Sequence, residues 1–216
     1  MLRPGGSPGP GTGGPERSVV AAGRRRRGDR GSLVLHRPYG YAGLGEVFVF
    51  VFFGLVATAG TTYVQAGAVP GWLWLSACGI GLLACSLLMV NNLRDIGTDP
   101  EHGKMTLAVR LGEPSARRVF SAMLHLPLVL GAASLVWARE VGSASPADGG
   151  GRIGPLLTLV IVLAVPLFLL PLVRRAVVPV RAGARGRDLI SSLRDAGLLE
   201  LAYGLVFAAA TVVITL

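Results

Sequence analysis

Two aspartates lie four residues apart where a long apolar run gives way to a polar stretch. The stretch, NNLRDIGTDPEHGKMTLAVRLG at 91–112, holds Asp95 and Asp99, with Arg94 and Lys104 nearby. Residues four apart share one face of a helix, and two carboxylates there repel each other. A divalent cation such as Mg²⁺ would reverse that repulsion, because it prefers carboxylate and phosphate oxygens. The basic neighbours suit the phosphate oxygens of a substrate.

Simpler readings of this stretch stay open at this point. A solvated loop with incidental charges explains an isolated pair of aspartates equally well. A calcium-binding EF-hand is excluded, because the sixth and twelfth positions counted from Asp95 are Pro100 and Thr106 rather than Gly and Glu. A phosphate-binding P-loop is excluded too, because DIGTDPEHGK lacks the first glycine of that motif.

The elements that carry this stretch are predicted to be membrane helices. Of the 216 residues, 51% are hydrophobic and 15% charged, and no charged residue occurs at 47–93 or 153–173. Apolar runs of this length span a lipid bilayer as helices. We expect an all-α integral membrane protein with five spans, at about 45–64, 70–90, 116–137, 154–173 and 197–216.

The N-terminal region has a different composition. Residues 1–36 are rich in Gly, Pro and Arg, with RRRR at 24–27, and cannot supply a hydrophobic core. We predict a disordered tail there, followed by a membrane domain at 37–216. Before the last span, RDLISSLRDAGLLELAYG carries apolar residues at helical spacing, which predicts that part of it lies along the membrane surface.

The distribution of Lys and Arg predicts the orientation. Basic residues concentrate in the tail, in 92–118 and in 174–195, whereas VQAGAVPG has none and 138–152 has two. The positive-inside rule then places the N-terminus in the cytoplasm and the C-terminus outside, in a multi-pass protein of the cell membrane. Trp72, Trp74 and Trp137 fall at the outer interface. No aromatic residues alternate with the basic ones, so nucleic acid is not an expected partner.

Three blocks of the sequence resemble one family of membrane enzymes. NNLRDIGTD followed by GKMTLAVRLG is similar to the second Asp-rich motif of the UbiA-type prenyltransferases. RPYGYAGLGEVFVFVFFGLVAT at 37–58 and LRDAGLLELAYG at 193–204 resemble the branch that prenylates 1,4-dihydroxy-2-naphthoate in menaquinone synthesis. The resemblance runs from about residue 37 to residue 216.

The resemblance implies a helical bundle that uses Mg²⁺ to transfer a polyprenyl group from polyprenyl diphosphate to 1,4-dihydroxy-2-naphthoate, giving demethylmenaquinol. It implies metal and catalytic roles for Asp95 and Asp99. The substrate-binding residues that it implies lie in the motif and in a cytoplasmic cap: Asn91, Asn92, Arg94, Lys104, Tyr39 and Tyr41.

The sequence also departs from the family. Members have about nine spans and a first Asp-rich motif, whereas five spans are predicted here and the only aspartate before Asp95 is Asp29. The chain therefore resembles the C-terminal part of the family. A catalytically incomplete fragment, a non-enzymatic membrane protein and a prenyltransferase for another aromatic acceptor remain alternatives.

Three further ionisable residues fall within or beside the predicted spans. His125 lies mid-span, and we expect a neutral, hydrogen-bonded histidine between packed helices. Glu46 and Glu200 lie near the starts of spans. Glutamates at helix N-termini interact favourably with the helix dipole, which favours a structural role for both.

Overall fold

The computed structural model describes residues 43–143 and 153–215, and every regular element in these two ranges is helical. The predicted tail at 1–36 lies outside them. The first span combines α2 (Gly45–Val49), the π-helix η1 (Phe50–Val56) and α3 (Ala57–Ala66). The others are α4 (Leu73–Arg94), α6 (Glu113–Ser143), α7 (Pro155–Arg181) and α8 (Ile190–Thr215). Short helices η2 (Pro100–His102), α5 (Leu107–Leu111) and η4 (Gly186–Leu189) lie in the connections.

Five helices are long and apolar enough to cross a membrane, which confirms the predicted all-α membrane fold. Several of them extend further than expected, among them α6, which covers Glu113–Ser143 rather than 116–137. The fourth continues to Arg181, so Arg174 and Arg175 belong to the helix. The segment before the last span is no separate surface helix, because α8 runs unbroken from Ile190. That surface prediction was wrong, since helical periodicity alone cannot distinguish a surface helix from the end of a spanning one.

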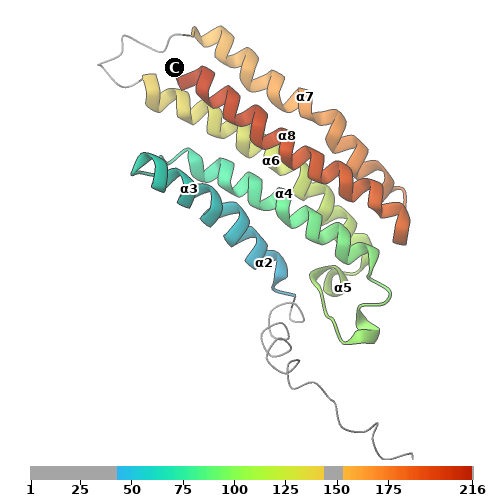
Figure 1. Ribbon diagram of the computed structural model, residues 1–216. Helices are drawn as coiled ribbons and strands as arrows, with labels where there is room; N and C mark the ends of the chain where they lie inside the picture. The colour runs from blue at the N-terminus through green and yellow to red at the C-terminus, as the bar shows by residue number, and fades with distance from the viewer. Residues whose placement is uncertain (1–42, 144–152, 216) are drawn as a thin grey trace, which may run out of the picture. The chain divides into compact units, whose positions relative to one another are not determined.

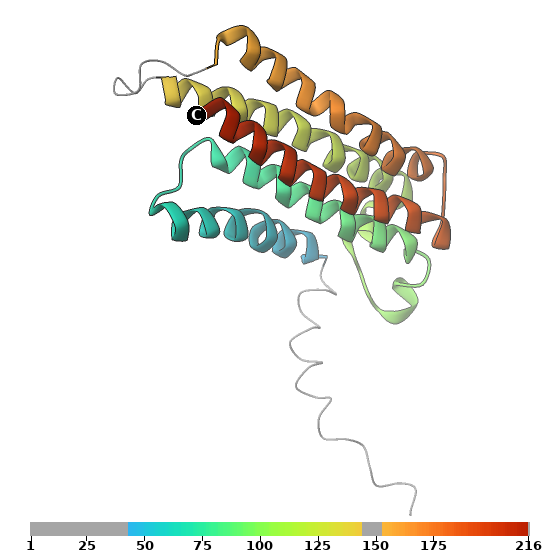
Figure 2. The same cartoon turned by 45° about the horizontal axis from the view of Figure 1, so that its top comes forward.

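Helix α4 lies in the middle of the bundle. An apolar stretch of 18 residues in α4 is 56% buried inside the bundle, whereas the corresponding stretch of the first span, Gly45–Ala66, is 11% buried. Helix α4 packs against α6, α8 and η1, and α7 packs against α8 and α6 (Figures 1 and 2). The first span and α7 therefore form opposite edges. The helix that Asp95 follows directly, α4, is the most buried of the five.

The first span meets α4 through two glycines. A Cβ atom on Gly54 would lie 2.5 Å from the Cα of Gly81, so the two backbones touch. Gly54 belongs to the π-helical segment, whose extra residue per turn shifts the helical register between α2 and α3. This contact brings the start of α2, with Glu46, close to the half of α4 that ends at Arg94.

An arginine network joins the ends of α6 and α7. Arg117 donates to the carbonyls of Val180 and of Ala184, the latter at 2.7 Å, and to Glu113 at 2.6 Å. Arg185 completes the network with two bonds to Glu113, at 2.9 and 2.8 Å. Arg117 therefore ties the start of α6 to backbone carbonyls at, and just after, the C-terminal end of α7.

The opposite end of the bundle is joined by hydroxyl groups and tryptophan. Ser76 donates to Ser134, which donates to the carbonyl of Trp72, both at 2.8 Å. The indole of Trp137 lies against Gly71, where a Cβ would come within 3.0 Å of the ring. Trp72 and Trp137 thus share one end of the bundle, as expected of an aromatic belt at one interface.

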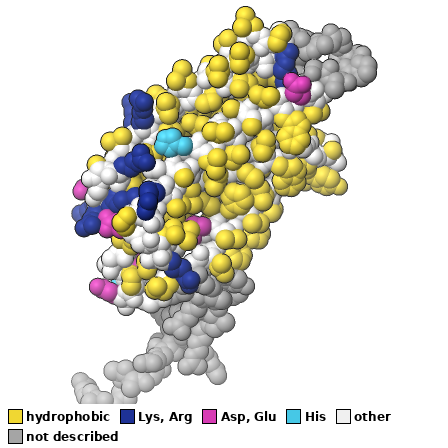
Figure 3. All heavy atoms as spheres, turned by 180° about the vertical axis from the view of Figure 1, so that it is seen from behind, with side chains coloured by type: hydrophobic (Ala, Val, Ile, Leu, Met, Phe, Trp, Pro, Cys, Tyr) yellow, Lys and Arg dark blue, Asp and Glu magenta, His cyan; other side chains and the backbone are white. Residues whose placement is uncertain are grey.

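Charged side chains gather at the end of the bundle away from the tryptophans. The segment 92–118 contains five Lys or Arg residues, and the segment 174–195 contains six. At the tryptophan end, the described residues include one basic side chain, that of Arg139. The space-filling view shows basic side chains collected towards one end of a largely apolar face (Figure 3). His125 lies exposed and bonds the carbonyl of Ser121 at 2.6 Å. The prediction that His125 is hydrogen-bonded is confirmed. The prediction that it packs between helices is wrong, because its side chain is exposed.

Candidate functional site

The two aspartates follow α4 directly. The helix ends at Arg94, and the Asp95 backbone at φ −100° and ψ 9° has left helical geometry. One further turn persists, because the amide of Asp99 donates to the carbonyl of Asp95 at 2.9 Å. The predicted helical stripe is therefore a turn. The i to i+4 spacing survives, but the loop that follows decides where each carboxylate lies.

Asp99 is the buried member of the pair. Its side chain is 10% exposed, and the ammonium of Lys104 lies 3.3 Å from each carboxylate oxygen. Only Oδ1 is placed to accept a hydrogen bond, so Oδ2 is buried without one despite that short distance. The Lys104 amide also donates to the Asp99 carbonyl at 2.9 Å. The loop thus folds back over Asp99 and leaves one acceptor atom unused.

Asp95 is more exposed and is fully paired. The guanidinium of Arg94 donates to both of its carboxylate oxygens at 2.8 Å. This pairing holds the pKa of the Asp95 carboxyl below its usual value. Asp95 is therefore ionised at neutral pH, and a cation that binds it must displace or share Arg94.

The donor atoms fit the Mg²⁺ that the resemblance implies. Among residues 43–143 and 153–215, no group of three or more His, Cys, Asp or Glu could hold a metal ion. Mg²⁺ often takes only one or two protein carboxylates and completes its shell with water and substrate phosphates. Asp99 offers a buried oxygen with no hydrogen bond. Asp95 and Asp99 therefore suit a metal bound together with a phosphorylated substrate.

The two asparagines differ in role. Asn92 is buried, and its amide donates to Oε1 of Glu46 on α2 at 3.0 Å. Asn91 is half-buried, and its carbonyl accepts the amide of Asp95 at 3.2 Å. Asn92 therefore ties the first span to the helix that carries the aspartates. Tyr39 and Tyr41 lie outside the described residues, so the predicted cap remains a prediction.

Glu46 belongs to this site, although the sequence favoured only a dipole interaction. The residue is 5% exposed, and its Oε2 is buried without a hydrogen bond. Its carbonyl accepts the thiol of Cys85 at 3.1 Å. An acidic residue near the start of a span was visible in the sequence. The contact with Asn92, 46 positions away, was not, because it depends on how α2 crosses α4.

The loop after the aspartates is shaped by a short capped helix. Thr106 has an extended backbone and is the N-cap of α5. Its side-chain oxygen accepts a hydrogen bond from the amide of Val109 at 3.4 Å. Arg110 donates to the carbonyl of Met105 at 3.2 Å. Gly43 lies so close to Arg110 that a Cβ would come within 2.9 Å of its Nε. The start of the described chain and the loop 95–112 therefore meet at the charged end.

Comparison with known proteins identifies relatives of this chain. Residues 32–182 match the model of the UbiA prenyltransferase family. The chain is 42% identical over 180 residues to a protein of Mycobacterium tuberculosis named 1,4-dihydroxy-2-naphthoate octaprenyltransferase, covering 81% of this chain and 52% of that protein. A protein of the same name from Escherichia coli is 51% identical over 94 residues, covering 44% of this chain and 30% of that protein.

A more distant relative is the human UbiA prenyltransferase domain-containing protein 1, 28% identical over 90 residues, covering 42% of this chain and 27% of that protein. No solved structure matches the chain. The chain spans about half the length of the mycobacterial relative. The family match covers most of the sequence and includes both aspartates, so this chain belongs to the UbiA prenyltransferase family.

Proposed function

We propose that this protein transfers a polyprenyl group from polyprenyl diphosphate to 1,4-dihydroxy-2-naphthoate, in the synthesis of menaquinone. Residues 37–216 are its membrane domain. Asp95 and Asp99 bind Mg²⁺ together with the diphosphate. The N-terminus is cytoplasmic, the C-terminus lies outside, and the membrane is the cell membrane.

One observation supports this proposal above the others. The buried Asp99 keeps a carboxylate oxygen without a hydrogen bond beside the ammonium of Lys104, at the charged end of an apolar bundle. A buried, under-satisfied acid costs stability unless something else binds it. Two mycobacterial relatives, each 42% identical to this chain, are named octaprenyltransferases of this acceptor.

The reaction exchanges one bond for another. The bond between the allylic carbon and the diphosphate oxygen breaks, and the diphosphate leaves with the electron pair. The ring carbon that bears the carboxylate bonds to the allylic carbon, and carbon dioxide leaves so that its electron pair restores the aromatic ring. The products are demethylmenaquinol, carbon dioxide and diphosphate.

The protein's residues stabilise the charge that develops on the leaving group. When bound, Mg²⁺ supplies Lewis-acid stabilisation of the diphosphate oxygens. Lys104 and Arg94 add positive charge at the same end, and both side chains are 37% exposed, which leaves them able to reach a ligand. Asn92 and Glu46 hold the end of α4 in place.

The test is a reconstitution of the full 216-residue chain in liposomes. Polyprenyl diphosphate, Mg²⁺ and 1,4-dihydroxy-2-naphthoate are supplied, and the prenylated quinol is measured by mass spectrometry. We expect product in the wild type, a loss of 100-fold or more in Asp99→Asn and in Asp95→Asn, and none with a chelator, since each change removes transition-state stabilisation on the order of 10²-fold or more.

The matched control is Glu101→Gln, which removes an exposed carboxylate from the same loop and should leave the rate unchanged. Activity that survives both aspartate changes would contradict the assigned metal site. A wild-type chain that forms no product would contradict transfer by this chain on its own. Product from 4-hydroxybenzoate but not from the naphthoate would assign a different aromatic acceptor.

A further inference from the structure

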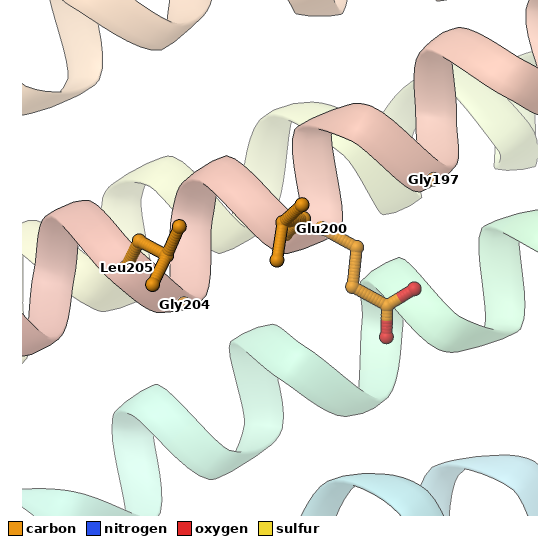
Figure 4. Close-up of a pocket in the computed structure, with 5 residues that line it drawn as sticks. Gly197, Glu200, Gly204 and Leu205 are labelled. Carbon is orange, nitrogen blue, oxygen red and sulfur yellow. The ribbon is translucent and has the colours of Figure 1, made fainter.

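A glutamate lies in an open groove on the last span. The groove has a volume of about 400 Å³ and is lined by Gly197, Glu200, Leu201, Gly204 and Leu205. Glu200 is half-buried, and its side chain extends from α8 towards α4 (Figure 4). Within the described ranges it has no hydrogen-bond or ion-pair partner. The proposed transfer reaction as argued above makes no use of this carboxylate.

Glu200 lies within the apolar part of the last span. It follows Asp195, the nearest charged residue before it, by five residues. At 1.5 Å per residue this is about 7 Å along the helix from the charged end, inside a hydrocarbon layer about 30 Å thick. Because its side chain extends towards α4, the carboxylate lies on the side of α8 that faces the bundle. An ionisable group at this depth is costly unless a partner or ligand satisfies it.

The groove has room for a flat ring. A Cβ on Gly204 would meet no atom within 4 Å, and one on Gly197 would touch only Leu87, at 3.9 Å. Leu201 and Leu205 are 60% and 65% exposed and form apolar walls. An open apolar groove with one polar group can hold a face of a flat aromatic ring and fix its orientation through the polar group.

We propose that this groove binds the ring of a hydroquinone, with one ring hydroxyl donating a hydrogen bond to Glu200. The inference rests on the proposed function, because the acceptor and the product of that reaction both carry two ring hydroxyls. A prenyl chain by itself would leave the carboxylate unsatisfied, whereas a phenolic hydroxyl satisfies it and the ring covers the leucines. The groove lies along a membrane span, so the ligand reaches it through the bilayer.

The binding test needs no turnover. The full chain is placed in lipid nanodiscs and titrated with 1-naphthol and with 1-methoxynaphthalene, whose ring lacks the hydroxyl donor. The fluorescence of each probe reports binding, and empty nanodiscs correct for partition into lipid. We expect the wild type to bind 1-naphthol about ten-fold more tightly, as a hydrogen bond to a charged group would give.

Two variants and a matched control assign the site. Glu200→Leu should abolish the preference for 1-naphthol. Gly204→Leu should weaken both probes about ten-fold, because a Cβ there points into open space and the leucine side chain would occupy the groove. Gly60→Leu is the control, since Gly60 is also a glycine in a membrane span with no atom within 4 Å of a Cβ, and it lies on another helix.

Equal affinity of the wild type for the two probes would overturn the proposal, as would an unchanged preference in Glu200→Leu. A Gly204→Leu variant that alters the oligomeric state but not naphthol binding would show that a helix of a second copy covers the groove instead. The proposed transfer reaction is tested separately. Naphthol binding without product would leave this site standing, whereas product without a naphthol preference would reject only the groove.

Discussion

Asp95 and Asp99 are chemically identical in the sequence but lie in different environments. Asp95 is paired on both oxygens by its neighbour Arg94, and Asp99 is buried under a loop with Lys104 beside it. The free energy needed to bring a cation to each carboxylate therefore differs. A cation at Asp99 would contact Oδ2, which has no hydrogen bond, whereas a cation at Asp95 would have to replace part of the pairing with Arg94. The buried residue is the stronger candidate for the first contact with metal.

The first prediction concerns Lys104→Met. The change removes the ammonium beside a buried carboxylate, which should lower the free energy of unfolding by about 1–3 kcal/mol in the absence of Mg²⁺. Added Mg²⁺ should restore part of this loss, because the freed Asp99 then binds the cation. Thermal melting in detergent, with and without Mg²⁺, measures both effects. Equal losses in the two conditions would argue against a metal at Asp99.

The second prediction concerns Asn92→Ala. This change leaves the buried carboxylate of Glu46 without its side-chain hydrogen bond and should lower the free energy of unfolding by about 1–3 kcal/mol. Asn91→Ala is the matched control, because Asn91 is half-buried and its side chain makes no hydrogen bond to the described residues. Unfolding titrations in mixed micelles compare the two. Equal stabilities would mean that the bond to Glu46 contributes little.

At the scale of the elements, a π-helical segment and a glycine contact position the site. The segment Phe50–Val56 interrupts the first span, and Gly54 within it touches the backbone of Gly81 on α4. Small residues allow membrane helices to approach this closely. The start of α2 then reaches Asn92, and the first span helps to fix the helix from which the aspartates follow.

The third prediction concerns Gly54→Ala. Its Cβ would come 2.5 Å from the Cα of Gly81 and 2.9 Å from the Gly81 nitrogen, so the helices must separate. Overpacking of this kind should lower the free energy of unfolding by about 1–3 kcal/mol. Gly60→Ala, on the same span but with open space around it, should change it by less than about 1 kcal/mol. Unfolding by denaturing detergent in bicelles measures both. A Gly54→Ala protein as stable as Gly60→Ala would contradict the close crossing.

At the scale of the whole helical unit, charge is distributed unequally between the two ends. The ends of α4 and α7 and the starts of α6 and α8 lie together (Figure 1). The segments that connect them, 92–118 and 174–195, carry most of the basic residues of the described chain. The opposite end carries the tryptophans and the Ser76–Ser134 contact. Such an asymmetry orients a membrane protein, and it brings basic residues to the same side as the aspartates.

The fourth prediction follows from this asymmetry. With Cys78 and Cys85 replaced by alanine, Glu101→Cys should react with a membrane-impermeant maleimide only in inside-out vesicles. Gln65→Cys, at the other end of the bundle, should react only in right-side-out vesicles. Both positions are exposed, so access to the reagent depends on the side of the membrane. The reverse labelling pattern would contradict a cytoplasmic aspartate loop.

The five spans, the family and the position of the Asp-rich stretch were predictable from the sequence. Apolar runs report membrane helices because lipid cannot hydrogen-bond a backbone, and the runs here are long and nearly free of charge. The blocks around Asp95 and Asp99 were enough to indicate the family that the comparison identified. The ends of the helices were less predictable, as the extension of α7 to Arg181 shows.

The tertiary structure alone decided which polar groups meet. Two contacts join elements far apart in the sequence: Glu46 with Asn92, and Arg117 with the carbonyls of Val180 and Ala184. The groove around Glu200 depends on the open space beside α8. The sequence determines which residues are acidic, basic or small, because these are local properties. It does not determine their partners, because a hydrogen bond across dozens of residues depends on how the helices cross, and that crossing depends on packing over the whole bundle.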